Sequence, residues 1–140
     1  MTQTVRFRVD FTAGCSIGPG KVALLEGIER TGSLRQAARE LGMSYRRAWL
    51  LLDQINQSFN TPATTTTVGG TGGGGATLTP FGAELIERYR ALEHAIQSLS
   101  HETLASLAPR ARTGPRGKVR GPSGAQRRRL SRTPAAGRAD

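Results

Sequence analysis

The sequence predicts a mainly α-helical domain, and three observations support this fold class. Residues 33–57 contain two apolar patterns of helical spacing, separated by a short stretch with a glycine. A run rich in threonine and glycine at residues 63–79 separates this pair from the rest of the chain. A heptad-type apolar pattern then begins after Thr79-Pro80. We therefore expect an N-terminal strand and a first helix, then helix, turn, helix, a β-hairpin and a long C-terminal helix.

The first predicted element is a strand at the N-terminus. Apolar residues alternate with polar ones at Val5, Phe7, Val9 and Phe11. A period of two is typical of a half-buried strand, and we expect its aromatic side to lie against the helices. Residues 12–18 contain two glycines and are predicted to form a loop.

Two helices are predicted next from their end signals. The N–H groups of the first helical turn have no hydrogen-bond partner within the helix, so proline, which lacks an N–H, is well tolerated there. A helix can therefore begin at Pro19, and Gly32 ends it. Ser33 then caps the next helix, with Gln36 three residues on completing a capping box. This helix ends at Gly42, because glycine accepts the left-handed conformation at a helix C-terminus.

The helix after Gly42 carries most of the predicted DNA-binding residues. Two helices joined by a short glycine-containing turn are typical of a helix-turn-helix unit, whose second helix enters the DNA major groove with its N-terminal end. Arginines there can reach guanine edges or phosphates, and hydroxyls can reach phosphates. The alternative is an ordinary helical hairpin whose arginines only face solvent. The candidate residues are Ser44 as the cap, Tyr45, Arg46 and Arg47, together with Ser33 at the start of the preceding helix.

Residues 63–79 are predicted to form a β-hairpin, because four consecutive threonines favour a strand and a short return strand follows. The tip is the glycine-rich run at residues 69–75, where glycine permits positive φ and a close approach to phosphate. A hairpin directly after a helix-turn-helix is a wing, and its candidate contacts are Thr71, Gly72 and Gly73. The alternative is a flexible linker that does not touch DNA.

A long helix is predicted to begin at Pro80, with Thr79 as its cap, and to continue to about Leu107. Its apolar residues alternate steps of four and three. A domain of this size can cover only part of such a stripe, so we expect a homodimer in which a second copy covers the remainder. Alternatively, the stripe packs only on its own domain. The predicted dimerisation residues are Leu85, Tyr89, Leu92, Ile96 and Leu99.

Charge is distributed unevenly along the 140 residues, whose formal net charge is +10. Residues 1–109 hold ten basic and nine acidic residues, whereas residues 110–140 hold ten basic residues and a single acidic one. We predict a DNA-binding and dimerisation domain at residues 1–108 and a disordered basic tail at residues 109–140, which has too few apolar residues to bury. The sequence RRRLSR at residues 127–132 can add phosphate contacts without sequence preference, or it has no role.

Other function classes find little support. Cys15 is the only cysteine, which excludes an intramolecular disulfide and fits a reducing compartment. The sequence shows no signal peptide and no stretch of the ~20 apolar residues that a membrane helix needs, so we expect a cytoplasmic protein without a membrane partner. His94 and His101 lack further metal ligands at convincing spacing. No phosphate loop, carboxylate pair or nucleophile elbow appears, so we predict that the protein is not an enzyme and needs no cofactor.

Two motifs resemble a known family. SYRRAW at residues 44–49 and GGTGGGGATLTPFG at residues 69–82 are similar to the N-terminal DNA-binding domain of the ModE family of molybdate-responsive regulators. That domain is a winged helix-turn-helix related to the LysR type. The similarity extends from about Val5 to Leu99 and implies a homodimer that binds inverted-repeat operators and controls molybdate-transport genes. It also implies that the wing lies at residues 69–75.

The chain departs from this family in two respects. The family often has a lysine at the position of Thr71, and apolar and charged residues where this chain has NTPATTTT. The motif SARNQ of the family's C-terminal oxyanion-binding domains is absent. We therefore expect that the chain acts without ligand, or that a separate molybdate-binding protein supplies the signal.

Two alternatives to the DNA-binding regulator remain open. The chain can be an interaction module that docks on such a partner through the Leu85–Leu99 stripe, with weak DNA binding. A third hypothesis is direct oxyanion binding by the backbone N–H groups of the glycine loop.

Overall fold

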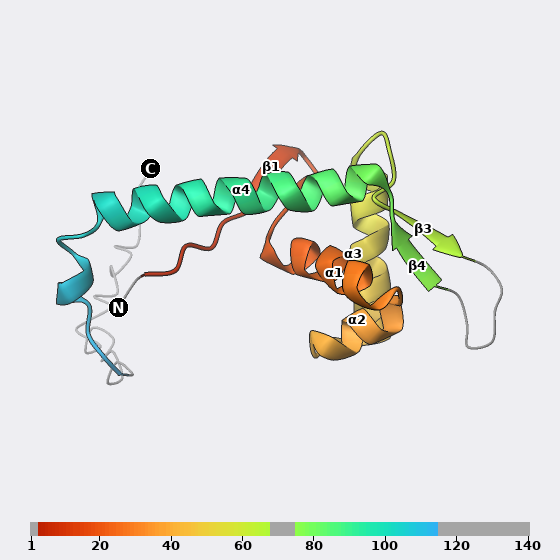
Figure 1. The fold of residues 1–140 in the computed structure, drawn as a ribbon, viewed down its shortest axis with the longest axis horizontal. Coiled ribbons are helices and arrows are strands. Elements are labelled where there is room, and N and C mark those ends of the chain that lie inside the picture. The colour runs from red at the N-terminus through yellow and green to blue at the C-terminus, as the bar shows by residue number, and fades with distance from the viewer. Residues whose placement is uncertain (1–2, 68–74, 115–140) are drawn as a thin grey trace, which may run out of the picture. The chain divides into compact units, whose positions relative to one another are not determined.

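The computed structural model describes residues 3–67 and 75–114, and the described residues up to Arg110 belong to one compact unit (Figure 1). This part of the chain is mainly helical, as predicted, with two small antiparallel sheets of two strands each. In chain order the elements are β1 (Val9–Thr12), β2 (Cys15–Ile17), α1 (Pro19–Thr31), α2 (Leu34–Glu40), α3 (Tyr45–Ser58), β3 (Thr64–Thr67), β4 (Gly75–Leu78), α4 (Pro80–Thr103) and the short 3-10 helix η1 (Ala108–Arg110).

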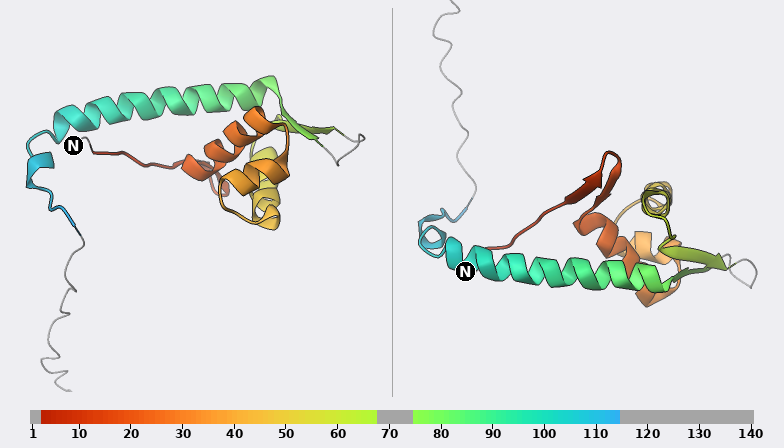
Figure 2. Two further views of the ribbon diagram at one scale, coloured as in Figure 1. Left: turned by 60° about the horizontal axis from the view of Figure 1, so that its bottom comes forward. Right: turned by 90° about the horizontal axis from the view of Figure 1, so that it is seen from above.

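Helices α1, α2 and α3 enclose the hydrophobic core beside the first half of α4 (Figure 2). Small residues let α1 and α2 approach closely, since a Cβ built on Gly27 would lie 3.0 Å from the Cβ of Ala37. Ala38 of α2 is also buried, so the side chains at this crossing are small and closely packed. The largest fully buried side chains belong to Val22, Leu24, Leu25, Ile28 and Ile55.

The helix ends follow the predicted caps. Ser33 Oγ accepts a hydrogen bond from Gln36 N at 3.2 Å, and Gly42 adopts a left-handed φ of 67° after α2. The capping box is only half formed, because Ser33 N donates to Thr31 Oγ1 at 3.2 Å instead of to the Gln36 side chain. The other predicted caps are present: Ser44 Oγ accepts from Arg47 N at 3.1 Å, and Thr79 Oγ1 accepts from Gly82 N at 3.0 Å.

The N-terminal segment is only partly a strand. Inward and outward side chains alternate along residues 3–10 as predicted. Only β1 is a strand, however, and it pairs with β2, which lies in the stretch that we expected to be a loop. Residues before β1 bond to α4 instead of to a neighbouring strand: Val5 N donates to Gln97 Oε1 at 2.9 Å, and Gln3 Nε2 donates to Ser100 O at 2.8 Å.

The two aromatic residues of this segment have different environments. Phe7 stacks on Tyr89 of α4 with ring centroids 4.8 Å apart, so the expectation that it faces a helix is confirmed. Phe11 is 55% exposed and meets Phe59 edge to face, with centroids 5.6 Å apart. The expectation that Phe11 packs inward is therefore wrong, because β1 and β2 form a small sheet at the edge of the core.

Helix α4 ends at Thr103, before the predicted end at Leu107. Its first half packs on α1, whereas its second half extends beyond the other helices and has the N-terminal segment beside it (Figures 1 and 2). Leu104 and Leu107 are 40% and 51% exposed, so little packing favours further helix there.

Candidate nucleic-acid interface

The N-terminal end of α3 is an exposed, positively charged surface. Tyr45 is 45% exposed, and Arg46 and Arg47 also face solvent. The first turn of α3 contains no acidic residue, and the helix macrodipole adds partial positive charge at the same end. This end of α3 is therefore suited to bind an anion such as a phosphate.

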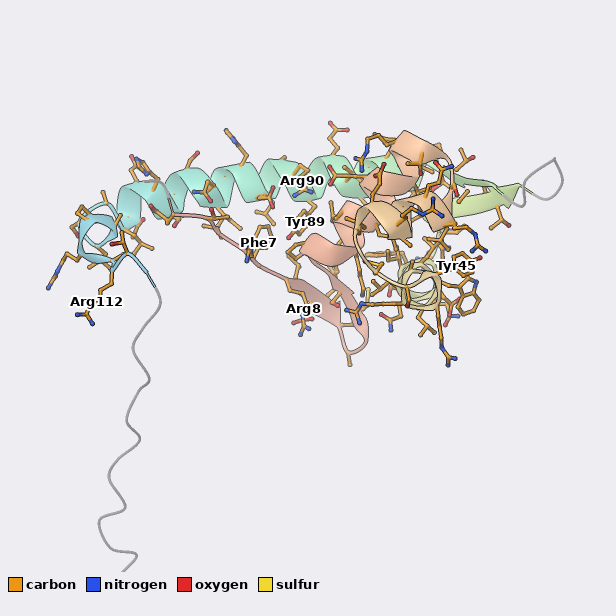
Figure 3. All side chains as sticks on the ribbon, turned by 90° about the horizontal axis from the view of Figure 1, so that it is seen from below. Phe7, Arg8, Tyr45, Tyr89, Arg90 and Arg112 are labelled. Atoms are coloured by element: carbon orange, nitrogen blue, oxygen red, sulfur yellow. The ribbon has the colours of Figure 1, made fainter. Side chains whose placement is uncertain are left out.

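A third arginine joins this surface from α2. The guanidinium carbon of Arg35 lies 4.7 Å from the centroid of the Tyr45 ring, within cation–π distance. This contact holds the Tyr45 ring at the solvent-facing side of the molecule (Figure 3). Arg35 is absent from the candidates predicted from sequence, because the contact joins two helices and only the tertiary structure brings the two residues together.

Two further large side chains are exposed on α3. Trp49 is 50% exposed and Leu50 is 46% exposed, although the core-facing Ala48, Leu52 and Ile55 of the same helix are buried. Trp49 follows Tyr45 by one turn. An apolar strip thus adjoins the basic residues at the start of the helix.

A groove separates α3 from the β3–β4 hairpin. Its volume is about 610 Å³. Polar and apolar residues of α3, of the hairpin and of the start of α2 line it. Hydroxyl groups of β3 line one side and side chains of α3 line the other. The lining includes Leu34, Tyr45, Trp49, Asp53, Thr65 and Thr66.

Asn56 fixes the hairpin relative to α3. Its Oδ1 accepts from Ala63 N at 2.9 Å and from Thr64 N at 3.2 Å, and its Nδ2 donates to Thr64 Oγ1 at 3.1 Å. The return strand is held at its start, because Ala76 N donates to Gly32 O at 3.0 Å. The described part of the hairpin is therefore attached firmly to the helices that present the basic surface.

The other predicted DNA-binding residues have different positions. Ser33 is half-buried, and its hydroxyl already accepts a hydrogen bond as the cap of α2. Ser44 is exposed and caps α3. Thr71, Gly72 and Gly73 lie outside the described residues, and so does most of the glycine run.

The predicted dimerisation stripe on α4 divides into two parts. Tyr89 is 4% exposed and its hydroxyl donates to Phe7 O at 2.9 Å, so it belongs to the core of its own chain. Leu85 is half-buried against the same core. Leu92 and Leu99 are 43% and 62% exposed.

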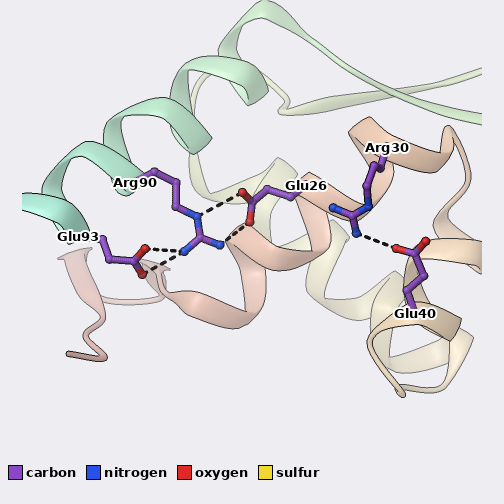
Figure 4. A network of polar contacts seen from close by, with 5 residues as sticks. All are labelled: Glu26, Arg30, Glu40, Arg90 and Glu93. Atoms are coloured by element: carbon purple, nitrogen blue, oxygen red, sulfur yellow. Dashed lines mark hydrogen bonds and ion pairs between the residues drawn. The ribbon is translucent and has the colours of Figure 1, made fainter. Parts of the chain in front are cut away.

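Arg90 connects α4 to α1. Its guanidinium forms an ion pair with Glu26 of α1 and two hydrogen bonds of 2.8 and 3.0 Å with Glu93 of α4 (Figure 4). These bonds, above all the one to Glu26, raise the pKa of Arg90 above its ordinary value. A second pair joins Arg30 of α1 to Glu40 of α2 at 2.7 Å and is exposed. The Arg90 pair orients α4 on the core.

Other kinds of site are not seen in the part of the chain that the structure describes. There, no three His, Cys, Asp or Glu side chains gather as metal ligands would. No helix among the described residues is long and apolar enough to cross a membrane. Cys15 is buried, and its Sγ lies 3.1 Å from Ser58 O, so it is a packed residue of the β2–α3 contact.

Comparison with known proteins agrees with the resemblance seen in the sequence. No protein-family model matches the chain. The molybdenum-pterin-binding protein MopB of Rhodobacter capsulatus is 43% identical over 98 residues, which are 69% of this chain and 36% of MopB. The molybdenum transport protein ModE of Azotobacter vinelandii is 38% identical over 93 residues, 66% of this chain and 34% of that protein. The DNA-binding transcriptional dual regulator ModE of Escherichia coli (strain K12) is 37% identical over 87 residues, 62% of this chain and 33% of that regulator.

The chain is related to the ModE and Mop proteins. It spans about a third of the length of these curated relatives. Their names describe transcriptional regulators and molybdenum-binding or molybdenum-transport proteins, and none of these names describes an enzyme.

Proposed function

We propose that this chain is a sequence-specific DNA-binding regulator of transcription. The observation that carries the proposal is the exposed end of α3, where Tyr45, Arg46 and Arg47 face solvent beside the groove that α3 forms with the hairpin. In this proposal α2 and α3 are the helix-turn-helix, α3 is the recognition helix, and the β3–β4 hairpin is the wing. The relationship to proteins named ModE, among them a DNA-binding transcriptional regulator, supports it.

The residues at the start of α3 and their neighbours on α2 have the following roles in this proposal. Arg46 and Arg47 reach guanine edges or phosphates from the major groove, and Tyr45 donates its hydroxyl to a phosphate. Arg35 keeps the Tyr45 ring in place and adds positive charge beside it. The caps Ser33 and Ser44 set where the two helices begin and lie near the phosphate backbone.

We further propose that the chain acts as a homodimer on an inverted-repeat operator. The exposed leucines of α4, Leu92 and Leu99, offer an apolar surface that a second copy can cover about a two-fold axis. Such a dimer presents two copies of α3 to successive major grooves. Residues 1–108 then form the DNA-binding and dimerisation domain, and the basic residues of 109–140 add salt-sensitive contacts.

The names of the relatives suggest the genes under control. Proteins named for molybdenum transport and molybdenum-pterin binding are 38% and 43% identical to this chain over about two thirds of its length, so we propose operators near molybdenum-related genes. In this proposal a molybdate-binding protein is a possible partner of the chain.

The second candidate function is a protein-interaction module with weak DNA binding. The exposed Leu92 and Leu99 favour it, because they also fit the apolar surface of a different protein. This function would be supported if the immobilised chain retained a molybdate-binding protein in the absence of DNA and the Leu92→Glu variant did not.

Fluorescence anisotropy tests the leading proposal. The labelled probes are the promoter of a molybdate-transport operon from the same source and a scrambled duplex of equal length and composition. The full chain should bind the promoter more tightly at physiological salt, and specific sites typically exceed nonspecific DNA by a factor of at least about 10³. Equal affinity for the promoter, for the scrambled duplex and for every duplex selected from a random library would contradict the proposal.

A further inference from the structure

We infer that the N-terminal half of α3 recognises thymine through apolar contacts of Leu50 and Trp49 with the 5-methyl group of the base. The inference rests on the proposed function and extends it, because it assigns two residues that read base identity without hydrogen bonds. It also names the class of ligand, which is duplex DNA with thymines inside each half-site.

The first observation is the exposure of the two side chains. Leu50 and Trp49 are 46% and 50% exposed, on a helix whose core face is closed by Ala48, Leu52 and Ile55 at 0%, 6% and 1%. Scattered apolar side chains are common on protein surfaces. Here, however, Trp49 lies one turn after Tyr45 and Leu50 one turn after Arg46, so the apolar residues of this strip are interspersed with the arginines on the exposed side of α3.

The second observation is the position of this strip relative to the arginines. Leu50 follows Arg46 by four residues, so both lie on one side of α3, about 6 Å apart along its axis. When Arg46 reaches a base edge in the major groove, Leu50 is therefore placed to contact a base within the same half-site.

The third observation concerns the chemistry of the occupant. The strip is bordered by Arg35, Arg46 and Arg47, and the first turn of α3 has no acidic residue. The only acidic side chain of α3 is that of Asp53, one turn further, where it accepts two hydrogen bonds from Gln57 at 3.0 and 2.9 Å. A ligand that complements this surface combines dense negative charge with small apolar groups. The DNA major groove has both, since thymine alone presents a methyl group there.

The test compares thymine with uracil, which lacks only the methyl group. Duplexes that bind the full chain are selected from a random library, and the enriched sequence is resynthesised with uracil at each thymine in turn. Wild-type protein should lose about fourfold in affinity for each contacted methyl group, as expected for exposing one methyl group to water. Substituting thymines outside the contacted positions should have no effect.

Two variants assign the effect to the residues. In Leu50→Ala and Trp49→Ala the uracil substitution should cost little at the position that each residue contacts, because the apolar partner is already missing. Both side chains are exposed, so α3 should keep its helical circular dichroism. The matched control is Leu107→Ala, since Leu107 is 51% exposed and lies outside α3; its uracil effect should equal that of the wild type.

The outcomes separate this inference from the proposed function. If the uracil forms of the enriched sequence bind as tightly as the thymine form, the inference is wrong, but the proposed function as a DNA-binding regulator still holds. The same holds if both variants keep the full uracil effect. Failure of the library to enrich any sequence overturns the proposed function, and the inference with it.

Discussion

Gly82 shows how one residue fixes the position of the hairpin. A Cβ built on Gly82 would lie 2.2 Å from the carbonyl oxygen of Ala63, so a larger residue cannot occupy this position without a backbone shift. The close approach leaves Ala63 fully buried between α4 and α3. The sequence placed Gly82 after a helix start but did not predict this requirement, because the carbonyl comes from a segment far from it in the chain.

Gly82→Ala should lower the free energy of unfolding by about 1–3 kcal/mol, because the added methyl group meets backbone rather than a side chain that can move. Urea unfolding followed by circular dichroism measures the change. Gly20→Ala is the matched control, since Gly20 also lies in the first turn of a helix but has open space around its Cβ position. That control should be neutral or stabilising by up to about 1 kcal/mol. Equal stability of Gly82→Ala and the wild type would contradict the packing described.

The residues that could be predicted from sequence are those whose structure is decided locally. Ser44 caps α3 as predicted because the signal consists of a few neighbouring residues, and Arg46 follows on the exposed end of that helix. Arg35 and Asn56 could not be predicted, because their partners lie on other elements. The sequence gives the type of each side chain but not the contacts that folding creates between distant segments.

At the scale of elements, the N-terminal segment and α4 depend on each other. Alternation correctly predicted that Val5, Phe7 and Val9 face inward, but it was wrong for Phe11. It could not show that their partner is a helix, since a period of two describes burial and not the neighbour. The contact is made by Phe7 on Tyr89 and by the reciprocal hydrogen bonds of Gln97 with the backbone of Gln3 and Val5.

Tyr89 makes this contact sensitive to high pH. Burial, and secondarily the charge of Glu93, raise the pKa of Tyr89 above its ordinary value of 10.0. Above that value the tyrosine of the unfolded chain loses its proton first, so the unfolded state is favoured as the pH rises. The stabilisation from the neutral phenol is complete below about pH 10 and declines as the pH passes the folded-state pKa.

We therefore expect the free energy of unfolding to fall as the pH rises above about 10, and to fall less in Tyr89→Phe than in the wild type. The variant also loses the bond to Phe7 O, so it should be less stable by about 1 kcal/mol at neutral pH. Urea titrations at a series of pH values measure both effects. Tyr45→Phe is the control, because it removes a phenol hydroxyl from an exposed side chain of α3, outside this contact. Parallel pH profiles for the wild type and Tyr89→Phe would contradict this role.

At the scale of the whole molecule, the apolar stripe of α4 lies in two different environments. Its first half completes the core of its own chain, and its second half presents Leu92 and Leu99 to solvent. The regular heptad pattern could not show where the part of the stripe that packs on the core ends and the exposed part begins. That boundary depends on how far α1 extends along α4, which only the tertiary structure reveals.

If the proposed homodimer forms through this surface, replacing Leu92 and Leu99 with glutamate should convert it to a monomer, because the charges would be buried at the interface without partners. Sedimentation equilibrium over a range of concentrations measures the association. Leu50→Glu is the control, since that leucine is similarly exposed but lies on α3. A double variant that associates as strongly as the wild type would exclude this surface as the interface.

The central claim is that the exposed end of α3 reads DNA sequence, and replacing Arg46 and Arg47 with alanine tests it most directly. Anisotropy titrations at physiological salt compare the wild type and the double variant on a selected duplex and on its scrambled form. The variant should bind the selected duplex about as weakly as the scrambled one, since each lost base contact costs about 1–3 kcal/mol of discrimination. If the double variant keeps the wild-type preference for the selected duplex, α3 is not the recognition helix and the account is wrong.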